Sequence, residues 1–275
     1  MPRQCSRKRR RSADLIMVEL GQAIREVLLT ASPAEKVRRA RALARHWRMG
    51  MLDHRFSAVM PDRPARPARP ELLPPNQMPK RGKGGSERGR IALLHALAHI
   101  EFVAIDLALD IVGRFGRDFP QGFADDWLRV AGDEAMHFAL LDRRLKALGS
   151  HYGALPAHIG LWESATETAF DARARLAIVP MVLEARGLDI TPMTIERFRN
   201  AGDEASARIL TRIMTDEIRH VGAGTKWFLW SCSRDDSNPV ETWKMLVKRH
   251  FRGELKPPFN DSARASAGLT QEFYK

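Results

Sequence analysis

The chain has 275 residues, of which 44% are hydrophobic and 28% charged, so it can bury a sizeable core and is not disordered throughout. Its two cysteines exclude a disulfide scaffold and a CxxC metal site, and they suit a reducing compartment. The formal net charge is +12, and the whole excess lies in residues 1–90, which hold 22 Lys and Arg against 8 Asp and Glu; the rest hold 23 against 25.

This basic N-terminal third sets the expectation for partners. Such a charge attracts polyanions, for example RNA or anionic lipid. The alternative is that the arginines solubilise the protein or lie along its own acidic body. No membrane-spanning segment is expected, because the most apolar stretch, Ile100–Val112, is shorter than the roughly 20 residues required and carries three carboxylates. A signal-peptide pattern is also absent, so the sequence predicts a cytoplasmic protein.

The pattern along the chain predicts an all-α protein. Its expected segments are a basic tail at 1–16, an N-terminal helical pair at 17–60, an extended Pro- and Arg-rich arm at 61–90, a four-helix bundle at 91–255 and a C-terminal tail at 256–275. Met17 opens an amphipathic pattern and is an alternative native start. Because prolines deny the arm helix and sheet hydrogen bonds, it is either a disordered linker or a strap that packs on the body through Leu72, Leu73 and Met78.

Local start and stop patterns place the helices. A capping box at Ser32-Pro33-Ala34-Glu35 opens the second helix, which ends near Gly50. Further along, the apolar period, with expected stops at Gly149, Gly187 and Gly253, predicts helices at 88–114, 122–148, 160–187, 193–200, 203–224 and 239–251. Pro180 falls inside the third of these and is expected to kink it.

Two Glu-x-x-His motifs, Glu134-x-x-His137 and Glu217-x-x-His220, are the main candidate functional residues of the sequence. Residues three apart share a helix face, so each motif offers a carboxylate and an imidazole to one point. Glu101 precedes the first motif by 33 residues, and Glu184 precedes the second by the same 33. The first set therefore recurs as a whole after 83 residues, which predicts two similar helical hairpins.

Four helices that carry Glu, Glu-x-x-His, Glu and Glu-x-x-His provide the ligand set of a ferritin-like di-iron or di-manganese bundle. Hard oxygen donors with imidazole and no thiolate favour two iron ions, with manganese or a mixed iron–manganese pair as alternatives. Asp133 and Asp216 each lie four residues before a ligand histidine and are candidates to orient an imidazole N–H. The competing interpretation is a bundle with buried salt links and no metal.

Other polar residues near the motifs are expected to have structural roles. His95 and His99, upstream of Glu101, are interpreted as hydrogen-bonded histidines rather than as additional ligands. Arg219 is expected to pair with a nearby carboxylate. Tyr152 follows a helix stop and Tyr274 is terminal, so neither is well placed for a tyrosyl radical beside the metals.

Long segments of the chain carry a family resemblance: PDRPARPARPELLPP and MPKRG in the arm, GRIALLHALAHIEFVAIDLALD after it, and the motifs AGDEAMHF and TDEIRHV. They resemble the uncharacterised ferritin-like proteins grouped as domain-of-unknown-function family 455, over roughly residues 17–255. This resemblance implies a ferritin-like bundle with a dinuclear centre, whose ligands are Glu101, Glu134, His137, Glu184, Glu217 and His220. It implies no substrate. A more distant similarity, in architecture and ligand pattern only, links the chain to the iron-dependent hydroxylases of isopentenylated tRNA adenosine.

The sequence therefore favours an oxidoreductase that activates O₂ to hydroxylate or oxidise a substrate, with a tRNA or nucleotide as one substrate class. Two alternatives remain. One is iron storage, to which the extra N-terminal helices and the arm are poorly suited; the other is a binding role in which metals only stabilise the fold. A monomer or dimer is expected rather than a shell.

Overall fold

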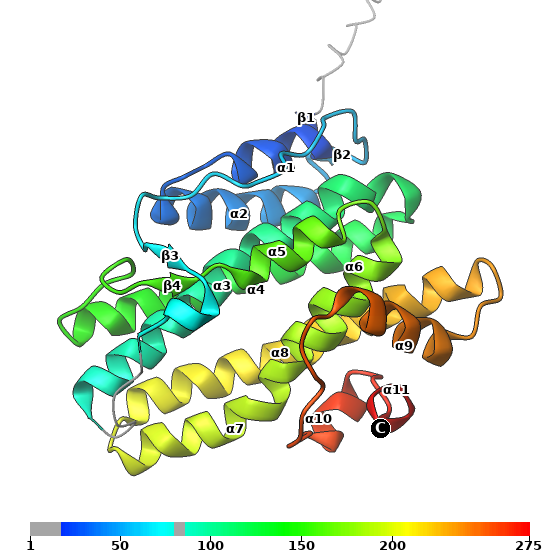
Figure 1. Cartoon of the computed structure of the whole chain (residues 1–275). Coiled ribbons are helices and arrows are strands. Elements are labelled where there is room, and N and C mark those ends of the chain that lie inside the picture. The colour runs from blue at the N-terminus through cyan, green and yellow to red at the C-terminus, as the bar shows by residue number, and fades with distance from the viewer. Residues whose placement is uncertain (1–17, 80–85) are drawn as a thin grey trace, which may run out of the picture.

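The computed structural model describes residues 18–79 and 86–275, and nearly every regular element within them is a helix, as the sequence predicted. The basic tail and Met17 lie outside the described residues. Figure 1 shows helices in layers, with an N-terminal pair on one side of a long central hairpin and a second long hairpin on the other side. These six helices are α1 (Leu20–Leu28), α2 (Pro33–Arg48), α3 (Glu87–Phe115), α4 (Gln121–Ala147), α7 (Ala185–Asn200) and α8 (Glu204–Ser233).

The N-terminal pair packs on the central hairpin, α1 against α3 and α2 against α4. A short parallel pairing of β1 (Val18–Glu19) with β2 (Leu52–Asp53) also joins the start of this pair to the segment that follows it. The predicted start of α2 is correct, but the capping box does not form. Ser32 makes no side-chain cap, and the Glu35 carboxylate bonds instead to Arg38 and Arg39 on the next turn. Exposed guanidinium groups thus outcompete the backbone for this carboxylate.

The arm is a strap, and the disordered-linker alternative is wrong for its described part. Its strand β3 (Leu72–Leu73) pairs in parallel with β4 (Ala157–His158), and the 3₁₀ turn η1 (Pro75–Gln77) follows. Its backbone carbonyls also accept bonds from the body: Pro61 from Arg114 at 2.6 Å and Asp62 from the Trp162 indole at 3.1 Å. Prolines leave carbonyls without helix or sheet partners, and here buried donors use them.

Deep ion pairs connect the N-terminal pair and the arm to α3. Lys36 on α2 is fully buried and bonds both to Asp106 on α3, at 2.6 Å, and to the Ala65 carbonyl of the arm, at 3.0 Å. One turn further along, Asp110 receives Arg114 at 2.7 Å and Arg175 at 2.6 Å. Two of the three carboxylates that interrupt the apolar stretch of α3, Asp106 and Asp110, are therefore paired inside the core.

The second half differs from the predicted helix at 160–187. It is divided into α5 (Gly160–Glu167) and α6 (Ala172–Ile178), because Asp171 caps a new helix by accepting bonds from the amides of residues 173 and 174. The chain then continues through a π-helical turn (Val179–Glu184, labelled η3) directly into α7. The expected kink at Pro180 is thus a π-helical segment, a form common where a helix carries functional residues.

The predicted stop at Gly187 is wrong, since α7 passes through both Gly187 and Pro192. A side chain at position 187 would meet nothing within 4 Å, so the glycine marks open space and not a cap. Pro192 cannot bond the carbonyl of Leu188, four residues earlier, and Asn260 from the C-terminal segment donates to that carbonyl at 3.1 Å. The predicted helix at 193–200 is therefore the end of α7. The helix predicted at 203–224 is α8, which continues to Ser233.

Residues 256–275 pack on the body and contain two short helices, α10 (Asp261–Ser266) and α11 (Gln271–Tyr274), that follow α9 (Pro239–His250). Buried Arg264 holds Asp189 on α7 with two bonds of 2.7 and 2.9 Å. Leu269, Phe273 and Tyr274 are buried as well. The segment predicted as a tail is thus part of the core.

One helical stretch in the described chain, Glu87–Asp118, which includes α3 and the 3₁₀ turn η2 (Gly116–Asp118), is long and apolar enough to cross a membrane by length and composition. The sequence expectation of no membrane-spanning segment considered only Ile100–Val112, which is part of this stretch. However, 67% of its most apolar window is buried inside the protein, as in the core helix of a bundle. The cytoplasmic location stays a prediction.

Candidate metal centre

The cluster lies between the two long hairpins, where α3, α4, the π-helical turn and α8 face one another. Glu101 comes from α3, Glu134 and His137 from α4, Glu184 from the π-helical turn, and Glu217 and His220 from α8. Each Glu-x-x-His pair lies on one helix face, as predicted. The side chains of His137, Glu134 and His220 are at most 1% exposed, so the cluster is shielded from bulk water.

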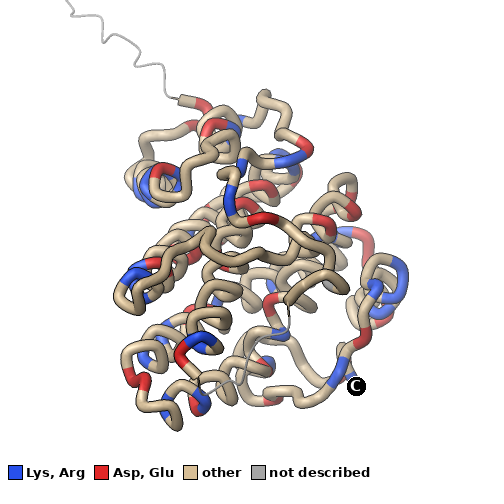
Figure 2. Tube along the Cα trace, turned by 60° about the vertical axis from the view of Figure 1, so that its left-hand side comes forward, with Lys and Arg blue, Asp and Glu red and all other residues tan. Residues whose placement is uncertain are grey.

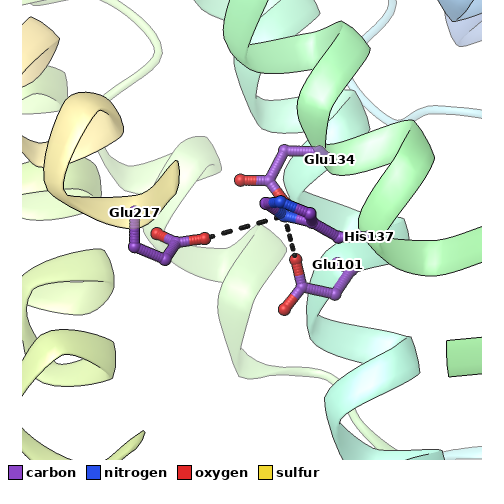
Figure 3. A group of neighbouring side chains, drawn as sticks. All are labelled: Glu101, Glu134, His137 and Glu217. Carbon is purple, nitrogen blue, oxygen red and sulfur yellow. Dashed lines mark hydrogen bonds and ion pairs between the residues drawn. The ribbon is translucent and has the colours of Figure 1, made fainter. Parts of the chain in front are cut away.

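Four of the predicted ligands approach one point closely. Ligand atoms of Glu101, Glu134, His137 and Glu217 all lie within 4.8 Å of one another. Nδ1 of His137 is 3.2 Å from a Glu101 oxygen, 3.5 Å from a Glu134 oxygen and 4.0 Å from a Glu217 oxygen. Figure 3 shows these carboxylates converging on the imidazole from three helices. The sequence analysis predicted all four residues.

The second histidine repeats this geometry on the other side. Nδ1 of His220 is 2.9 Å from the remaining Glu134 oxygen and 3.5 Å from the same Glu217 oxygen. The two imidazole rings are 5.7 Å apart between centroids. Glu134 and Glu217 therefore lie between the histidines, and each histidine directs Nδ1 toward them.

Glu184, which is not part of the close group of four, lies near enough to Glu217, Glu134 and His220 for their charges to affect it. The residue is half-buried, but its Oε2 is inaccessible to solvent and has no hydrogen-bond partner among the described residues. Its pKa is raised well above the ordinary value, by burial first and then by the negative charges of Glu217 and Glu134. Glu184 is the last residue of the π-helical turn, so the irregular backbone at Pro180 positions this carboxylate.

The outer nitrogen of each histidine lies beside an aspartate of the other hairpin. Nε2 of His137 on α4 bonds to Asp216 on α8 at 3.2 Å, and Nε2 of His220 on α8 lies 3.5 Å from Asp133 on α4. The sequence analysis considered each aspartate only with the histidine of its own motif. The observed pairs connect the two hairpins and leave both Nδ1 atoms directed at the cluster centre.

Arginines restrain these aspartates in turn. Arg219 donates to Asp216 at 2.6 Å and to Asp133 at 3.2 Å, which agrees with the predicted carboxylate pairing. Arg212 donates to Asp216 at 2.7 Å, and the sequence analysis missed it although the four-residue spacing on one helix was visible. Burial raises the pKa of Asp216, but the bonds from Arg212, His137 and Arg219 lower it to about 2.

The cluster holds more negative charge than its own histidines compensate. Burial, and next the charge of Glu134, raise the pKa of Glu101 well above its ordinary value. For His137, burial lowers the pKa, but its bonds to Glu101 and Glu134 raise it to about 11. Without a cation, the four carboxylates are thus partly neutralised by protons. A cation in the same place would replace them.

The donor atoms are better arranged to bind a metal ion than to form hydrogen bonds with one another. Within the described residues, buried Glu134 Oε2, Glu184 Oε2 and both nitrogens of His220 have no hydrogen-bond partner. The 2.9 Å approach of His220 to Glu134 is a close contact at an unfavourable angle, since it does not count as a hydrogen bond. Orphaned buried donors and acceptors cost about 1–3 kcal/mol each, and a bound cation would satisfy them.

The neighbouring histidines are structural, as predicted. His99 bonds through Nε2 to the His158 carbonyl at 3.1 Å and through Nδ1 to the Tyr152 hydroxyl at 2.9 Å. His95 accepts the Gly153 amide at 2.9 Å.

Tyr152 packs against the sequence neighbours of two cluster residues. The chain turns back after α4, and the Tyr152 ring packs on Phe102 and Phe138, which directly follow Glu101 and His137. The turn that reverses the chain gave no clear pattern in the sequence.

The fold and the site define an all-α helical bundle protein with a buried Glu/His cluster that can hold a metal ion. The family model described as "Protein of unknown function (DUF455)" matches residues 29–275. The chain is 38% identical over 268 residues to an "Uncharacterized protein" of Haemophilus influenzae, covering 93% of this chain and 92% of that protein. The protein therefore belongs to the DUF455 family, as its motifs indicated. No solved structure matches the chain.

Proposed function

We propose that the cluster is a ferritin-like dinuclear metal centre, with iron as its metal, in an oxidoreductase that activates O₂ to hydroxylate or oxidise a substrate. The observation that carries this proposal is the paired arrangement of two histidines on either side of two central glutamates. Glu101 and His137 would hold one ion, Glu184 and His220 the other, and Glu134 and Glu217 would be shared. Four carboxylates nearly neutralise two divalent ions, and the donor set favours iron or manganese over zinc.

Bound iron would supply the one-electron and O₂ chemistry. The chain's own residues hold the donors in place and exclude bulk water. Asp216 holds the His137 imidazole by a hydrogen bond, Asp133 lies beside Nε2 of His220, and the arginines behind the two aspartates keep them ionised. The buried aromatic residues Phe102 and Phe138, which follow Glu101 and His137 in the sequence, pack against each other.

A largely apolar cavity of about 680 Å³, which none of the six cluster residues lines, is the candidate place for a substrate. Ile100 and Leu183, which immediately precede Glu101 and Glu184, line it, as do His99 and Phe251. Its volume is typical of sites for small organic molecules. We place the substrate of the oxidation here.

Metal analysis tests the proposal. The purified protein should contain about two metal ions per chain. Glu134→Gln should lose most of this metal, because it removes the carboxylate shared by both histidines while keeping the side-chain shape. The matched control is Glu196→Gln, an exposed residue on α7 outside the cluster. Equal metal content in the two variants, with intact folds, would refute a dinuclear centre at this place.

Oxygen uptake separates the proposed oxidase from a purely structural site. The ferrous protein should consume O₂, and Glu217→Gln should reduce the rate at least tenfold. A parent protein that binds two ions but consumes no O₂ when reduced would show that the metals stabilise the fold only. Iron storage requires a large shell, so elution as a monomer or dimer in gel filtration would exclude it.

A further inference from the structure

A groove between α2 and α4 is lined by a group of positively charged side chains. Elsewhere Lys and Arg are interspersed with Asp and Glu along the chain (Figure 2). The groove has a volume of about 1190 Å³ and lies where α2 packs on α4, with the middle of α8 at one end. Its cationic lining is entirely arginine: Arg38, Arg41, Arg45, Arg48, Arg129, Arg212 and Arg219. The carboxylates in the lining are Asp125 and Asp133.

Four of these arginines have no partner in the described part of the chain. Arg41, Arg45, Arg48 and Arg129 are exposed and make no hydrogen bond or ion pair with any described residue. By contrast, Arg38 is held by Glu35, and Arg212 and Arg219 are held by Asp216. Asp125 accepts the Trp47 indole at 2.7 Å and makes no ion pair with any of the four free arginines.

The free arginines form an ordered row. Positions 41, 45 and 48 follow the three- and four-residue spacing of one helix face, so the row of free arginines on α2 is roughly 10 Å long, and Arg38, which Glu35 holds, lies one turn before it. Arg129 on α4 faces it across the groove. A row of guanidinium groups binds the oxygen pairs of successive phosphates bidentately, which lysine does less well.

We propose that this groove binds the phosphodiester backbone of a nucleic-acid strand. The groove is larger than the usual 300–1,000 Å³ of a small-molecule site, and its cations are spread along a line, as a polyanion requires. A flat lipid surface is a poorer fit, because the arginines line a recess and not a protruding face. The lining has no exposed aromatic ring for base stacking, so the contacts are with phosphates and independent of base sequence.

The groove lies next to the cluster, but the proposed nucleic-acid binding does not depend on the cluster. Asp133 and Arg219 belong both to the groove wall and to the set that holds the two histidines. A bound strand would therefore lie against the outer side of the metal centre. Binding requires only the free arginines, so it is measurable whether or not the protein holds metal.

Two variants of equal charge test the proposal. In the groove variant, all four free arginines are replaced: Arg41→Gln, Arg45→Gln, Arg48→Gln and Arg129→Gln. In the control variant, four exposed arginines outside the groove, whose side chains bond to no described residue, are replaced instead: Arg143→Gln, Arg197→Gln, Arg208→Gln and Arg249→Gln. Both keep the basic tail, and circular dichroism checks both folds.

Fluorescence anisotropy with labelled 20-nucleotide RNA and DNA strands over a salt series gives the readout. The parent should bind, and the plot of log K against log salt should become shallower by about 3 in the groove variant, since each lost phosphate contact removes about 0.7. The control variant should keep the parent slope. The RNA and DNA arms show which strand is preferred.

Three outcomes would overturn the proposal. The first is no binding by the parent at low salt. The second is an equal loss in both variants, which would assign the affinity to overall charge. The third is stronger, groove-dependent binding to vesicles that contain anionic phospholipid than to either strand, which would make the groove a membrane contact.

Discussion

At the scale of single residues, Asp216 is the position where the metal proposal meets its sharpest test. Its carboxylate receives His137 Nε2 at 3.2 Å as well as Arg212 and Arg219, so it fixes the direction of an imidazole that would bind metal. Asp216→Asn keeps the shape but removes the charge. We expect metal affinity to fall about 10- to 100-fold while the fold remains. Titration of the metal-free protein with ferrous ion measures it.

The control for this change is Asp235→Asn, since Asp235 pairs with Arg173 on the surface and away from the cluster. It should leave the metal affinity unchanged. An Asp216→Asn protein with the parent affinity would contradict the role given to this aspartate.

The cluster shows which part of a site a sequence reveals. Spacing along one helix places Glu134 beside His137, because the helical period alone fixes that distance. The equal spacing between the two halves of the sequence also predicted a repeat that includes Glu101 and Glu184. The crossing of Asp133 to His220 was not predictable in this way, since it depends on how two hairpins dock, and no spacing within one helix contains that information.

His95 predicts a pH dependence of stability. Burial, and then the charge of His151, lower the pKa of His95 to about 4, and its Nε2 accepts the Gly153 amide only while the ring is neutral. The unfolded chain, with a pKa near 6.5, therefore binds a proton at a higher pH than the folded chain does. The stabilisation is complete above pH 6.5 and is lost as the pH falls toward 4. This site alone should cost roughly 2 kcal/mol between pH 7 and pH 5.

Urea unfolding at both pH values measures that loss. His95→Gln cannot be protonated, so its loss between pH 7 and pH 5 should be smaller than the parent's by about that 2 kcal/mol. Its stability at pH 7 is irrelevant to the comparison. Equal losses in parent and variant would contradict the assignment to His95.

At the scale of elements, the π-helical turn depends on how closely α8 approaches it. A Cβ added at Gly224 would lie 2.4 Å from the Cβ and Cγ of Pro180, whereas one added at Gly222 meets nothing closer than 3.8 Å. Gly224→Ala should therefore push the turn away and lower the free energy of unfolding by about 1–3 kcal/mol. Gly222→Ala, on the same helix, should be neutral or stabilise by up to about 1 kcal/mol. Thermal unfolding compares the two.

Gly224→Ala also tests whether the π-helical turn positions Glu184 for metal binding. Since Glu184 ends this turn, Gly224→Ala should also weaken metal binding on the His220 side, while Gly222→Ala should not. Parent-like stability and metal content in Gly224→Ala would mean that the close approach is unimportant.

The elements also explain where helix prediction fails. Periodicity found α3, α4 and α8, because an apolar face repeats over many turns in each. It joined α5 to α6 because it gave no weight to Asp171 as a cap, and it ended α7 at Gly187 because it treated a glycine in open space as a stop. The predicted end of α8, at residue 224, was too early, because the apolar face of the helix continues beyond it into contacts with distant segments. Local patterns do not contain those tertiary contacts.

At the scale of the whole molecule, the N-terminal pair and the arm are parts of one core rather than appendages. Lys36 connects α2, the arm and α3 through bonds to Asp106 and to the Ala65 carbonyl, with both charged side chains fully buried. Lys36→Met would leave the Asp106 carboxylate buried without a partner. We expect a loss of about 3–5 kcal/mol in the free energy of unfolding, measured by urea denaturation.

The double variant Lys36→Met with Asp106→Leu gives the control, because it removes both charges and leaves apolar side chains in their place. It should recover most of the stability lost in Lys36→Met, as buried ion pairs replaced by packed apolar groups often do. Recovery would show that the single variant fails because of an unpaired charge and not because the layers separate. If the double variant is as unstable as Lys36→Met, the ion pair itself holds the N-terminal helices and the arm on α3, and replacement by packing is insufficient.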